Sequence, residues 1–238
     1  MIKHLITGGC SFSADNFCWP VHLAEQLNIT HDQTGVGSSG NDLISRKVIR
    51  QVYDCLQAGM SPEEMYVGVM WSGPGRKAFY VESDATLKLC KPYISDTSPH
   101  VWPEGSKPHG WVLINPFFDN KFAMGYYKTY NNSIQDQIET YEHMLRLQLF
   151  LKSYNIKYFF STYTNEVLND PKNSAVFVDH LKDLIDWNRF LPVKSMHSWC
   201  TKNYPDYFPV KVDPHPGNFQ HKQFAAEVIV PWLDKRNA

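Results

Sequence analysis

The chain has 238 residues, of which 43% are hydrophobic and 20% charged, and 23 Lys and Arg against 24 Asp and Glu give a formal net charge of -1. These are values of an ordinary globular protein, and they exclude disorder, collagen-like repeats and coiled coil. Balanced charge without a Lys/Arg-rich run argues against a nucleic-acid partner. A chain of this length buries roughly 70% of the surface that its unfolded form exposes. We therefore expect a single domain over residues 1–238.

The cysteines and the apolar runs bear on the cellular compartment in which the protein is expected. The five cysteines are scattered, odd in number and never spaced Cys-x-x-Cys; they are Cys10, Cys18, Cys55, Cys90 and Cys200. This pattern favours free thiols in a reducing cytoplasm over disulfides or a zinc site. The N-terminal apolar run meets Gly8 and Gly9 too early for a signal-peptide core. No segment has the apolar length of a membrane span, so we expect no membrane partner. The cysteine pattern is the ground for expecting a cytoplasmic protein.

Strands and helices alternate along the predicted chain. Continuous apolar runs indicate strands, and apolar residues at helical spacing indicate helices. The predicted strands cover residues 3–7, 65–71 and 156–161, with one more between the first two helices, and the predicted helices cover residues 18–27, 42–56, 133–154, 176–190 and 218–233. Asn41 or Asp42 is the expected N-cap of the second helix. This order predicts a three-layer α/β/α fold with a central parallel sheet, of the flavodoxin-like type.

Two segments show no regular periodicity. Residues from about 76 to 132 are dominated by Pro, Gly, His and aromatic residues, and residues 194–212 are irregular and aromatic. Long structureless loops tend to be lids or binding surfaces. The aromatic residues of the 76–132 insertion could stack on sugar rings, or could form a satellite core or an oligomer interface.

Two loops carry residues suited to catalysis. Ser11 follows the first predicted strand, where its hydroxyl would lie at the carboxyl end of the sheet, near backbone N–H groups that can stabilise an oxyanion. His215 lies two residues after Asp213 and between two prolines, just before the last predicted helix. This arrangement can orient an imidazole. Either loop alone also fits a structural turn, but together they supply a nucleophile, a base and the residue that orients the base.

At these loops the sequence resembles the SGNH (GDSL-like) hydrolase superfamily. Residues 9–13, Gly-Cys-Ser-Phe-Ser, match its first block, Gly-Asp-Ser-x-Ser, with Cys10 in place of the aspartate. Residues 35–42 look like the second block, and residues 213–215 look like a shortened final block, Asp-x-x-His. The resemblance extends in order over about the whole chain, except for the central insertion.

The resemblance implies an SGNH-type fold and a catalytic mechanism. Ser11 would attack an ester carbonyl, His215 would take the proton, and Asp213 would orient the imidazole. The N–H groups of Ser11 and of Gly37 or Gly40 would bind the oxyanion. The mechanism requires neither a metal nor another cofactor.

The third block of the superfamily, Gly-x-Asn-Asp, is absent after the third predicted strand. Its asparagine donates a hydrogen bond to the oxyanion, and Asn41 or Ser72 is the expected replacement; without one, the rate falls by about 10²–10³. Arg76 could bind a carboxylate or phosphate of the substrate, or could be solvated or structurally paired. His197 has no metal-ligand spacing and is expected to be packed.

We therefore expect a serine esterase that acts on a small acyl ester, such as an O-acetyl group on a carbohydrate. Two alternatives remain open: a binding protein that keeps the SGNH fold without efficient chemistry, and an O-acyltransferase that passes the acyl group to an acceptor hydroxyl. A thiol nucleophile at Cys10 is a further rival, although Cys10 should point to the opposite side of the turn from Ser11.

Overall fold

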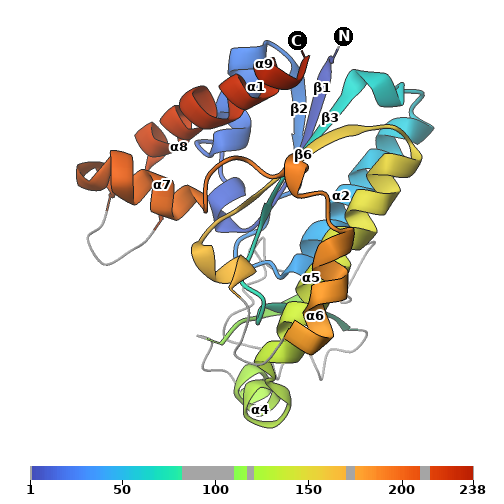
Figure 1. Ribbon diagram of the computed structural model, residues 1–238, viewed down its shortest axis with the longest axis vertical. Coiled ribbons are helices and arrows are strands. Elements are labelled where there is room, and N and C mark those ends of the chain that lie inside the picture. Colours follow the sequence, from blue (N-terminus) through green and yellow to red (C-terminus); the bar gives the residue numbers. More distant parts are fainter. Residues whose placement is uncertain (1, 82–109, 117–120, 170–174, 210–214, 238) are drawn as a thin grey trace.

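The computed structural model describes residues 2–81, 110–116, 121–169, 175–209 and 215–237. Its main sheet has four parallel strands in the order β2-β1-β3-β6. Their bounds are His4–Gly8 for β1, Thr30–Gln33 for β2, Met65–Trp71 for β3 and Lys157–Thr162 for β6. Helices cover both faces of this sheet (Figure 1). The predicted three-layer α/β/α fold with a central parallel sheet is confirmed.

The helices fall into two layers. Helices α1 (Trp19–Leu27), α8 (Asn218–Phe224) and α9 (Val230–Asn237) cover one face, and helices α2 (Asn41–Gln57), α5 (Ser133–Ser153) and α6 (Ala175–Leu184) cover the other (Figure 1). A π-helical turn, Ala225–Ile229, joins α8 to α9. The chain therefore enters α9 without a break in the helix, as the single predicted helix over 218–233 required.

Strand β3 shows why the core has two halves. All seven of its residues are buried. Met65, Val67, Val69 and Trp71 belong to the apolar cluster that includes α2, α5 and α6, whereas Tyr66 and Met70 belong to the cluster that includes α1 and α8. Successive side chains of a strand point to opposite faces. A parallel strand with helices on both sides therefore reads as a continuous apolar run, as this one does.

Two predictions about local structure are wrong. Residues 194–212 were expected to be irregular, but Met196–Asn203 form helix α7, whose N-cap Ser195 accepts a hydrogen bond from the Ser198 N–H. The predicted helix over 176–190 ends earlier, because α6 closes at Leu184. Residues Phe190 and Leu191 instead run beside β6, where Phe190 forms a parallel bridge with Phe160.

The insertion over 76–132 contains regular structure, contrary to the sequence-based expectation. Strands β4 (Lys77–Val81) and β5 (Gly110–Ile114) form an antiparallel pair, and α4 covers Lys121–Tyr130. A small apolar cluster joins β4, β5 and α4; it consists of Phe79, Ile114, Phe122, Ala123, Tyr126 and Tyr127. Four aromatic residues of the insertion, Phe79, Phe122, Tyr126 and Tyr127, thus contribute to a satellite core. Residues 82–109 and 117–120 of the insertion lie outside the described residues.

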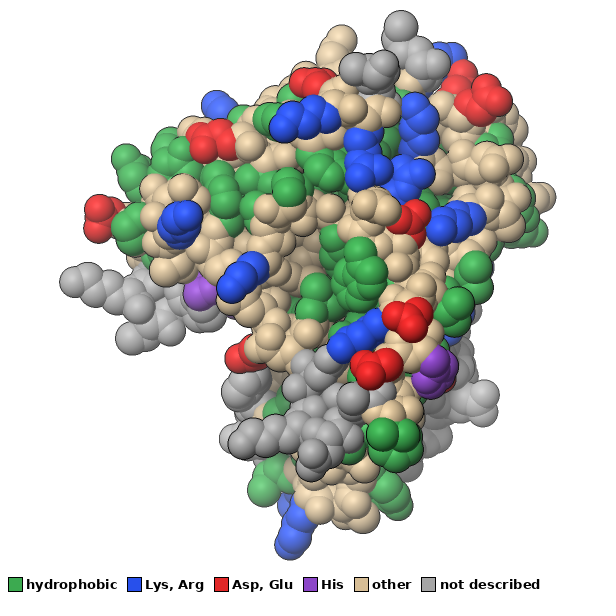
Figure 2. All heavy atoms as spheres, in the orientation of Figure 1, with side chains coloured by type: hydrophobic (Ala, Val, Ile, Leu, Met, Phe, Trp, Pro, Cys, Tyr) green, Lys and Arg blue, Asp and Glu red, His purple; other side chains and the backbone are tan. Residues whose placement is uncertain are grey.

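The surface agrees with the near-neutral charge of the chain. Lys and Arg side chains lie beside Asp and Glu side chains on the face drawn in Figure 2. The two ends of the described chain lie together near the amino-terminal ends of the strands (Figure 1), where Ile2, Leu233 and Asp234 line one surface hollow. The carboxyl ends of the parallel strands lie on the opposite side of the molecule.

Gly68 on β3 provides a test of the core packing. A Cβ atom at Gly68 would lie 2.6 Å from Phe159 Cζ and 3.1 Å from Trp19 Cη2. Because both rings are fully buried, we expect Gly68→Ala to lower the free energy of unfolding by about 1–3 kcal/mol, measured by urea denaturation.

Gly125→Ala is the matched control. Gly125 lies within α4, and a Cβ atom there would meet nothing within 4 Å. Alanine favours the helix over glycine by about 1 kcal/mol, so this variant should be at least as stable as the wild type. Equal stability of the two variants would contradict the packing described here.

Candidate active site

Ser11 and His215 meet at the carboxyl end of the sheet. Ser11 begins a 3₁₀ turn (Ser11–Ser13) directly after β1, and His215 lies just before α8. The Ser11 Oγ lies 2.7 Å from the His215 Nε2, although 204 residues separate them in the chain. Ser11 is half-buried and His215 is exposed. The pair is therefore accessible from solvent, and its geometry is that of a hydroxyl and a base able to exchange a proton.

The position of Ser11 follows from the strand order. The order β2-β1-β3-β6 changes direction at β1, because the chain first adds β2 on one side and then β3 on the other. In open α/β sheets, ligands bind at such a switch point, beyond the carboxyl ends of the strands. The turn that holds Ser11 lies at this point.

Two glycines allow the loops after β1 and β2 to pack tightly. A Cβ atom at Gly9 would lie 2.4 Å from the Ser13 Oγ, and one at Gly35 would lie 2.3 Å from the Ser13 carbonyl oxygen. Neither position has room for a larger side chain. The Val36 N–H donates to the Gly9 carbonyl at 3.1 Å and joins the two loops directly. The second loop is thereby held against the turn that carries Ser11.

A buried cysteine, Cys18, and a buried histidine, His221, form hydrogen bonds around the Ser11 turn and the start of α1. The Cys18 thiol donates to the Ser11 carbonyl at 3.6 Å, and the Trp19 N–H donates to His221 Nδ1 at 3.1 Å. Burial lowers the pKa of His221 to about 3, with smaller contributions from His22 and His215. His221 is therefore neutral, and its proton lies on Nε2, which faces the Cys18 sulfur at 3.8 Å.

The residues of the second loop differ in their surroundings. Gly37 lies in a half-buried turn. Gly40 is the N-cap of α2, so the prediction that Asn41 or Asp42 caps this helix is wrong. A Cβ atom at Gly40 would lie 2.3 Å from the Arg76 carbonyl oxygen. This close contact places the start of α2 against the loop that follows β3.

Asn41 joins three elements of the fold. Its side-chain oxygen accepts from the Ser72 N–H at 2.7 Å, and its side-chain nitrogen donates to the Ser72 carbonyl at 3.0 Å and to the Thr140 Oγ1 at 3.1 Å. Both hydrogens of the amide are therefore engaged. This geometry does not support Asn41 as a donor to the oxyanion, because its donors hold the end of β3 to α2 and α5.

Ser72 and Arg76 form one unit after β3. The Ser72 side chain is fully buried, and its Oγ accepts a hydrogen bond of 3.0 Å from Arg76 Nη1. The Arg76 Cζ lies 4.9 Å from the centroid of the Tyr163 ring, which follows β6. A guanidinium over an aromatic face is attracted by the negative potential of the ring. The side chain of Arg76 is thus fixed by a hydroxyl on one side and by a ring below it.

Aromatic contacts join these residues to the Ser11–His215 pair. The Phe12 ring lies 5.0 Å from the His215 ring and 5.3 Å, edge-on, from the Tyr163 ring. Tyr163 was not identified from the sequence, although its position directly after the carboxyl end of β6 could have indicated it. The carboxyl ends of β1, β3 and β6 therefore contribute side chains to one continuous site.

His197 also belongs to this surface. Its backbone N–H donates to the Tyr163 carbonyl at 3.0 Å, and its ring contacts Phe208. Burial lowers the pKa of His197, with a smaller contribution from the nearby His215. His197 is packed, as expected from the sequence, but it also lies close to the candidate base. Asp213, the expected orienting carboxylate, lies outside the described residues.

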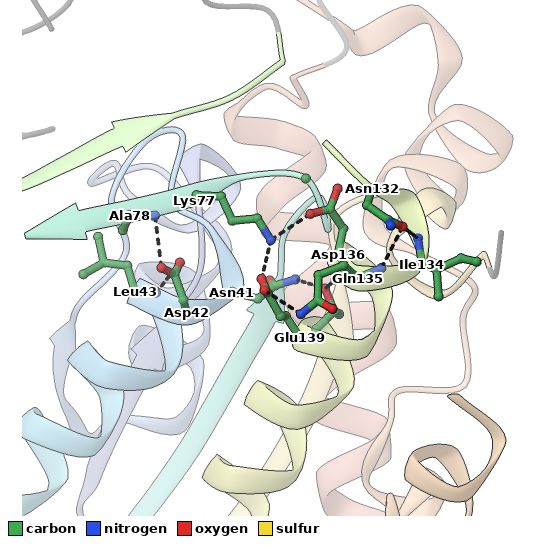
Figure 3. Close-up of polar contacts among 12 residues, drawn as sticks. Asn41, Asp42, Leu43, Lys77, Ala78, Asn132, Ile134, Gln135, Asp136 and Glu139 are labelled. Atoms are coloured by element: carbon green, nitrogen blue, oxygen red, sulfur yellow. Dashed lines mark hydrogen bonds and ion pairs between the residues drawn. The ribbon is translucent and has the colours of Figure 1, made fainter. Parts of the chain in front are cut away.

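A cluster of buried charges fastens β4 beside Asn41 (Figure 3). The Lys77 ammonium pairs with Asp136 at 2.8 Å and with Glu139, both on α5. Burial alone would lower the pKa of Lys77, but these two carboxylates raise it. Asp42 accepts from the N–H groups of Leu43 and Ala78, and burial raises the pKa of its carboxyl. The cluster therefore holds β4 to both α2 and α5.

One other group in the described part of the chain has metal-ligand chemistry. His4, Asp32 and Cys55 bring their potential ligand atoms within 4.8 Å of one another. Three side chains converge on the Asp32 Oδ2, namely His4 Nε2 at 2.9 Å, Gln51 Nε2 at 2.7 Å and Cys55 Sγ at 3.7 Å. These hydrogen bonds account for the group as a structural link between β1, β2 and α2. His4 begins β1, so the group lies toward the end of the sheet opposite Ser11.

Comparison with known families gives a match over most of the chain. Residues 6–197 match the family described as a family of unknown function (DUF6071). The chain belongs to this family. None of the curated proteins compared with the chain matches it. Among the described residues, no helix has both the length and the apolar character needed to cross a membrane.

A solved structure with a similar course of the chain is a candidate lipolytic protein of the G-D-S-L family from Desulfitobacterium hafniense DCB-2. The two chains share 13% sequence identity and superpose with a TM-score of 0.47. The alignment covers 94% of the present chain and 96% of the other.

The buried His221 predicts a dependence of stability on pH. Its folded pKa of about 3 lies below the ordinary value of 6.5, so the unfolded chain binds the proton first. Its contribution to stability is complete above pH 6.5 and is lost as the pH falls toward 3. From pH 7 to pH 5 this loss amounts to about 2 kcal/mol.

His221→Asn tests this contribution, because asparagine keeps an acceptor for the Trp19 N–H but does not titrate. Urea denaturation at pH 7 and pH 5 should show a smaller loss of stability for this variant than for the wild type. His180→Asn, at an exposed position on α6, should lose as much as the wild type. A full loss in His221→Asn would contradict the assigned neutral state.

Proposed function

We propose that the protein is a serine esterase in which Ser11 is the nucleophile and His215 the general base. The observation that supports this function best is the 2.7 Å contact between the Ser11 Oγ and His215 Nε2 at the switch point of the parallel sheet. A serine hydroxyl is a weak nucleophile until a neighbouring base accepts its proton. This pair brings the two groups together in an accessible position.

The proposed reaction has two steps. The Ser11 Oγ attacks the ester carbonyl while His215 Nε2 accepts the hydroxyl proton, and the resulting tetrahedral oxyanion collapses as the alcohol leaves with that proton. Water then attacks the acyl-enzyme, His215 accepts a proton from the water, and the acid is released as Ser11 regains its proton. Asp213 would orient the His215 ring, as the SGNH resemblance implies.

Backbone groups are the proposed oxyanion donors. The Ser11 N–H donates to no acceptor within the described ranges of the chain, and Ser11 is the first residue of its 3₁₀ turn. A glycine N–H from the second loop, Gly37 or Gly40, would be the other donor. Because the amide of Asn41 is engaged with Ser72 and Thr140, we expect a slower enzyme than one with a side-chain donor.

Cys10 is not the nucleophile in this proposal. Its side chain is fully buried in the apolar cluster that also contains Phe12 and Trp19. A thiol that is fully buried among apolar side chains is out of reach of a substrate. The substrate is expected to be a small acyl ester, of which an O-acetyl group on a carbohydrate is one example.

Activity measurements test the roles of Ser11 and His215. We expect Ser11→Ala and His215→Ala each to lower kcat for p-nitrophenyl acetate by about 10³-fold or more, because the nucleophile and the base act as one unit. A serine-directed phosphonate should give a single adduct, placed on Ser11 by mass spectrometry.

Ser153→Ala and His180→Ala are matched controls, because both residues are exposed and lie far along other helices, α5 and α6. Unchanged rates in Ser11→Ala and His215→Ala, with no adduct, would contradict the proposal and favour a binding protein. Formation of a new ester when glycerol is added would instead identify an acyltransferase.

A further inference from the structure

Arg76 carries a charge that the described part of the chain does not neutralise. Three of the other arginines form ion pairs with carboxylates: Arg46 with Asp42, Arg50 with Asp54 and Arg189 with Asp186. Within the described ranges, the partners of the half-buried Arg76 are a hydroxyl and an aromatic ring, and no carboxylate lies within ion-pair distance. Removing a cation from water without a counter-ion is unfavourable, so such a cation is a strong candidate for an anion site.

The neighbouring residue shows that carboxylates are available nearby. Lys77 follows Arg76 directly in the sequence and forms ion pairs with both Asp136 and Glu139 of α5 (Figure 3). A Cβ atom at Gly75 would lie 3.4 Å from the Asp136 Oδ2, so this carboxylate lies close to the backbone just before Arg76. The Asp136 carboxylate nevertheless forms its ion pair with Lys77. Among the described residues, the fold therefore gives one of two adjacent cations two carboxylate partners and the other none.

The guanidinium is held in a fixed orientation. Arg76 Nη1 donates to the buried Ser72 Oγ, and the backbone of Ser72 is bound on both sides by the Asn41 amide. Asn41 in turn donates to Thr140, which donates to the Asp136 carbonyl at 2.9 Å. Tyr163 supports the flat face of the guanidinium. Such support reduces the conformational entropy that binding would otherwise cost, so the remaining N–H groups are preorganised for a planar anion.

Arg76 is connected to the proposed catalytic pair through aromatic side chains. A chain of ring contacts leads from His215 through Phe12 to Tyr163, and the guanidinium lies over Tyr163. The carbonyl of Arg76 also packs against Gly40 in the second loop. Because the rings of Phe12 and Tyr163 stand between His215 and the guanidinium, this placement suits a remote group of the substrate rather than the ester carbonyl itself.

We propose that Arg76 binds a carboxylate on the substrate, so that the enzyme prefers esters that carry a negative charge at a distance from the ester bond. This inference rests on the proposed function for the position of the ester, and it names the substrate class for the same site. A carboxylate matches the fork of a guanidinium and accepts two parallel hydrogen bonds.

Two esters that differ only in charge test the proposal. 4-Acetoxybenzoate carries a carboxylate across a ring from its acetyl ester, and 4-acetoxybenzamide carries a neutral amide of the same shape. We expect wild type to hydrolyse the benzoate with the higher kcat/KM. Arg76→Gln should lower kcat/KM about 10- to 100-fold for the benzoate and leave that for the benzamide nearly unchanged.

Two further variants serve as references. Arg76→Lys keeps the charge but not the fork, and it should give an intermediate rate on the benzoate. Arg50→Gln removes an exposed arginine on α2 and should change neither rate. Equal losses on both esters in Arg76→Gln would overturn the proposal and make Arg76 an oxyanion donor or a structural residue, and unchanged rates on both would overturn it as well.

A binding measurement separates this proposal from the proposed function. In Ser11→Ala, titration calorimetry should detect binding of 4-acetoxybenzoate, and the double variant Ser11→Ala/Arg76→Gln should bind it at least 10-fold more weakly. If wild type hydrolyses neither ester, the esterase proposal fails while this binding difference still tests Arg76. Equal binding by the single and double variants would overturn the role of Arg76 even if the esterase proposal holds.

Discussion

Parallel pairing of β1 with a different strand on each side is the constraint on which the candidate site depends. The register places His4 of β1 opposite Thr30 of β2 and Met65 of β3, so the three strands start together and their following loops emerge at one edge. The loops that follow neighbouring strands therefore begin close to one another. Gly9 and Gly35, after β1 and β2, bring these two loops into direct contact, because a larger side chain at either position would clash with Ser13. Chemistry at this edge thus follows from the topology before any individual side chain is considered.

The buried amide of Asn41 plays the second organising part. Asn41 was one of two residues expected from the sequence to donate to an oxyanion, whereas its amide joins α2, β3 and α5 instead. An unpaired buried backbone group is costly, and the amide satisfies both the N–H and the carbonyl of Ser72. These bonds use only the backbone of Ser72, and its side-chain hydroxyl accepts a hydrogen bond from Arg76. The polar network therefore connects the stability of the helix layer to the position of a charged side chain at the surface.

Sequence patterns predicted the buried elements well and the exposed or short ones poorly. Strand β3 and helix α5 were evident because burial forces a continuous apolar run in one and helical spacing in the other. Strand β2, Thr-His-Asp-Gln, is polar because it lies at the edge of the sheet, so its residues could not be named in advance. The Ser11–His215 pair was predicted from two loops, because their residue types together supply a nucleophile and a base. The partners of Asn41 could not be predicted, because they depend on contacts between residues 31 and 99 positions apart.

The two ends of the described chain lie side by side at the amino-terminal ends of the strands, away from Ser11 (Figure 1). A short linker could therefore join them without disturbing the strand pairing, and the chain could be reopened at a surface turn such as the one around Gly59, where a side chain would meet no neighbour within 4 Å. Circular permutants of this kind should keep the same layers. For the same reason, a protein fused to either end would project from the side opposite the candidate site and leave the entrance for substrate open.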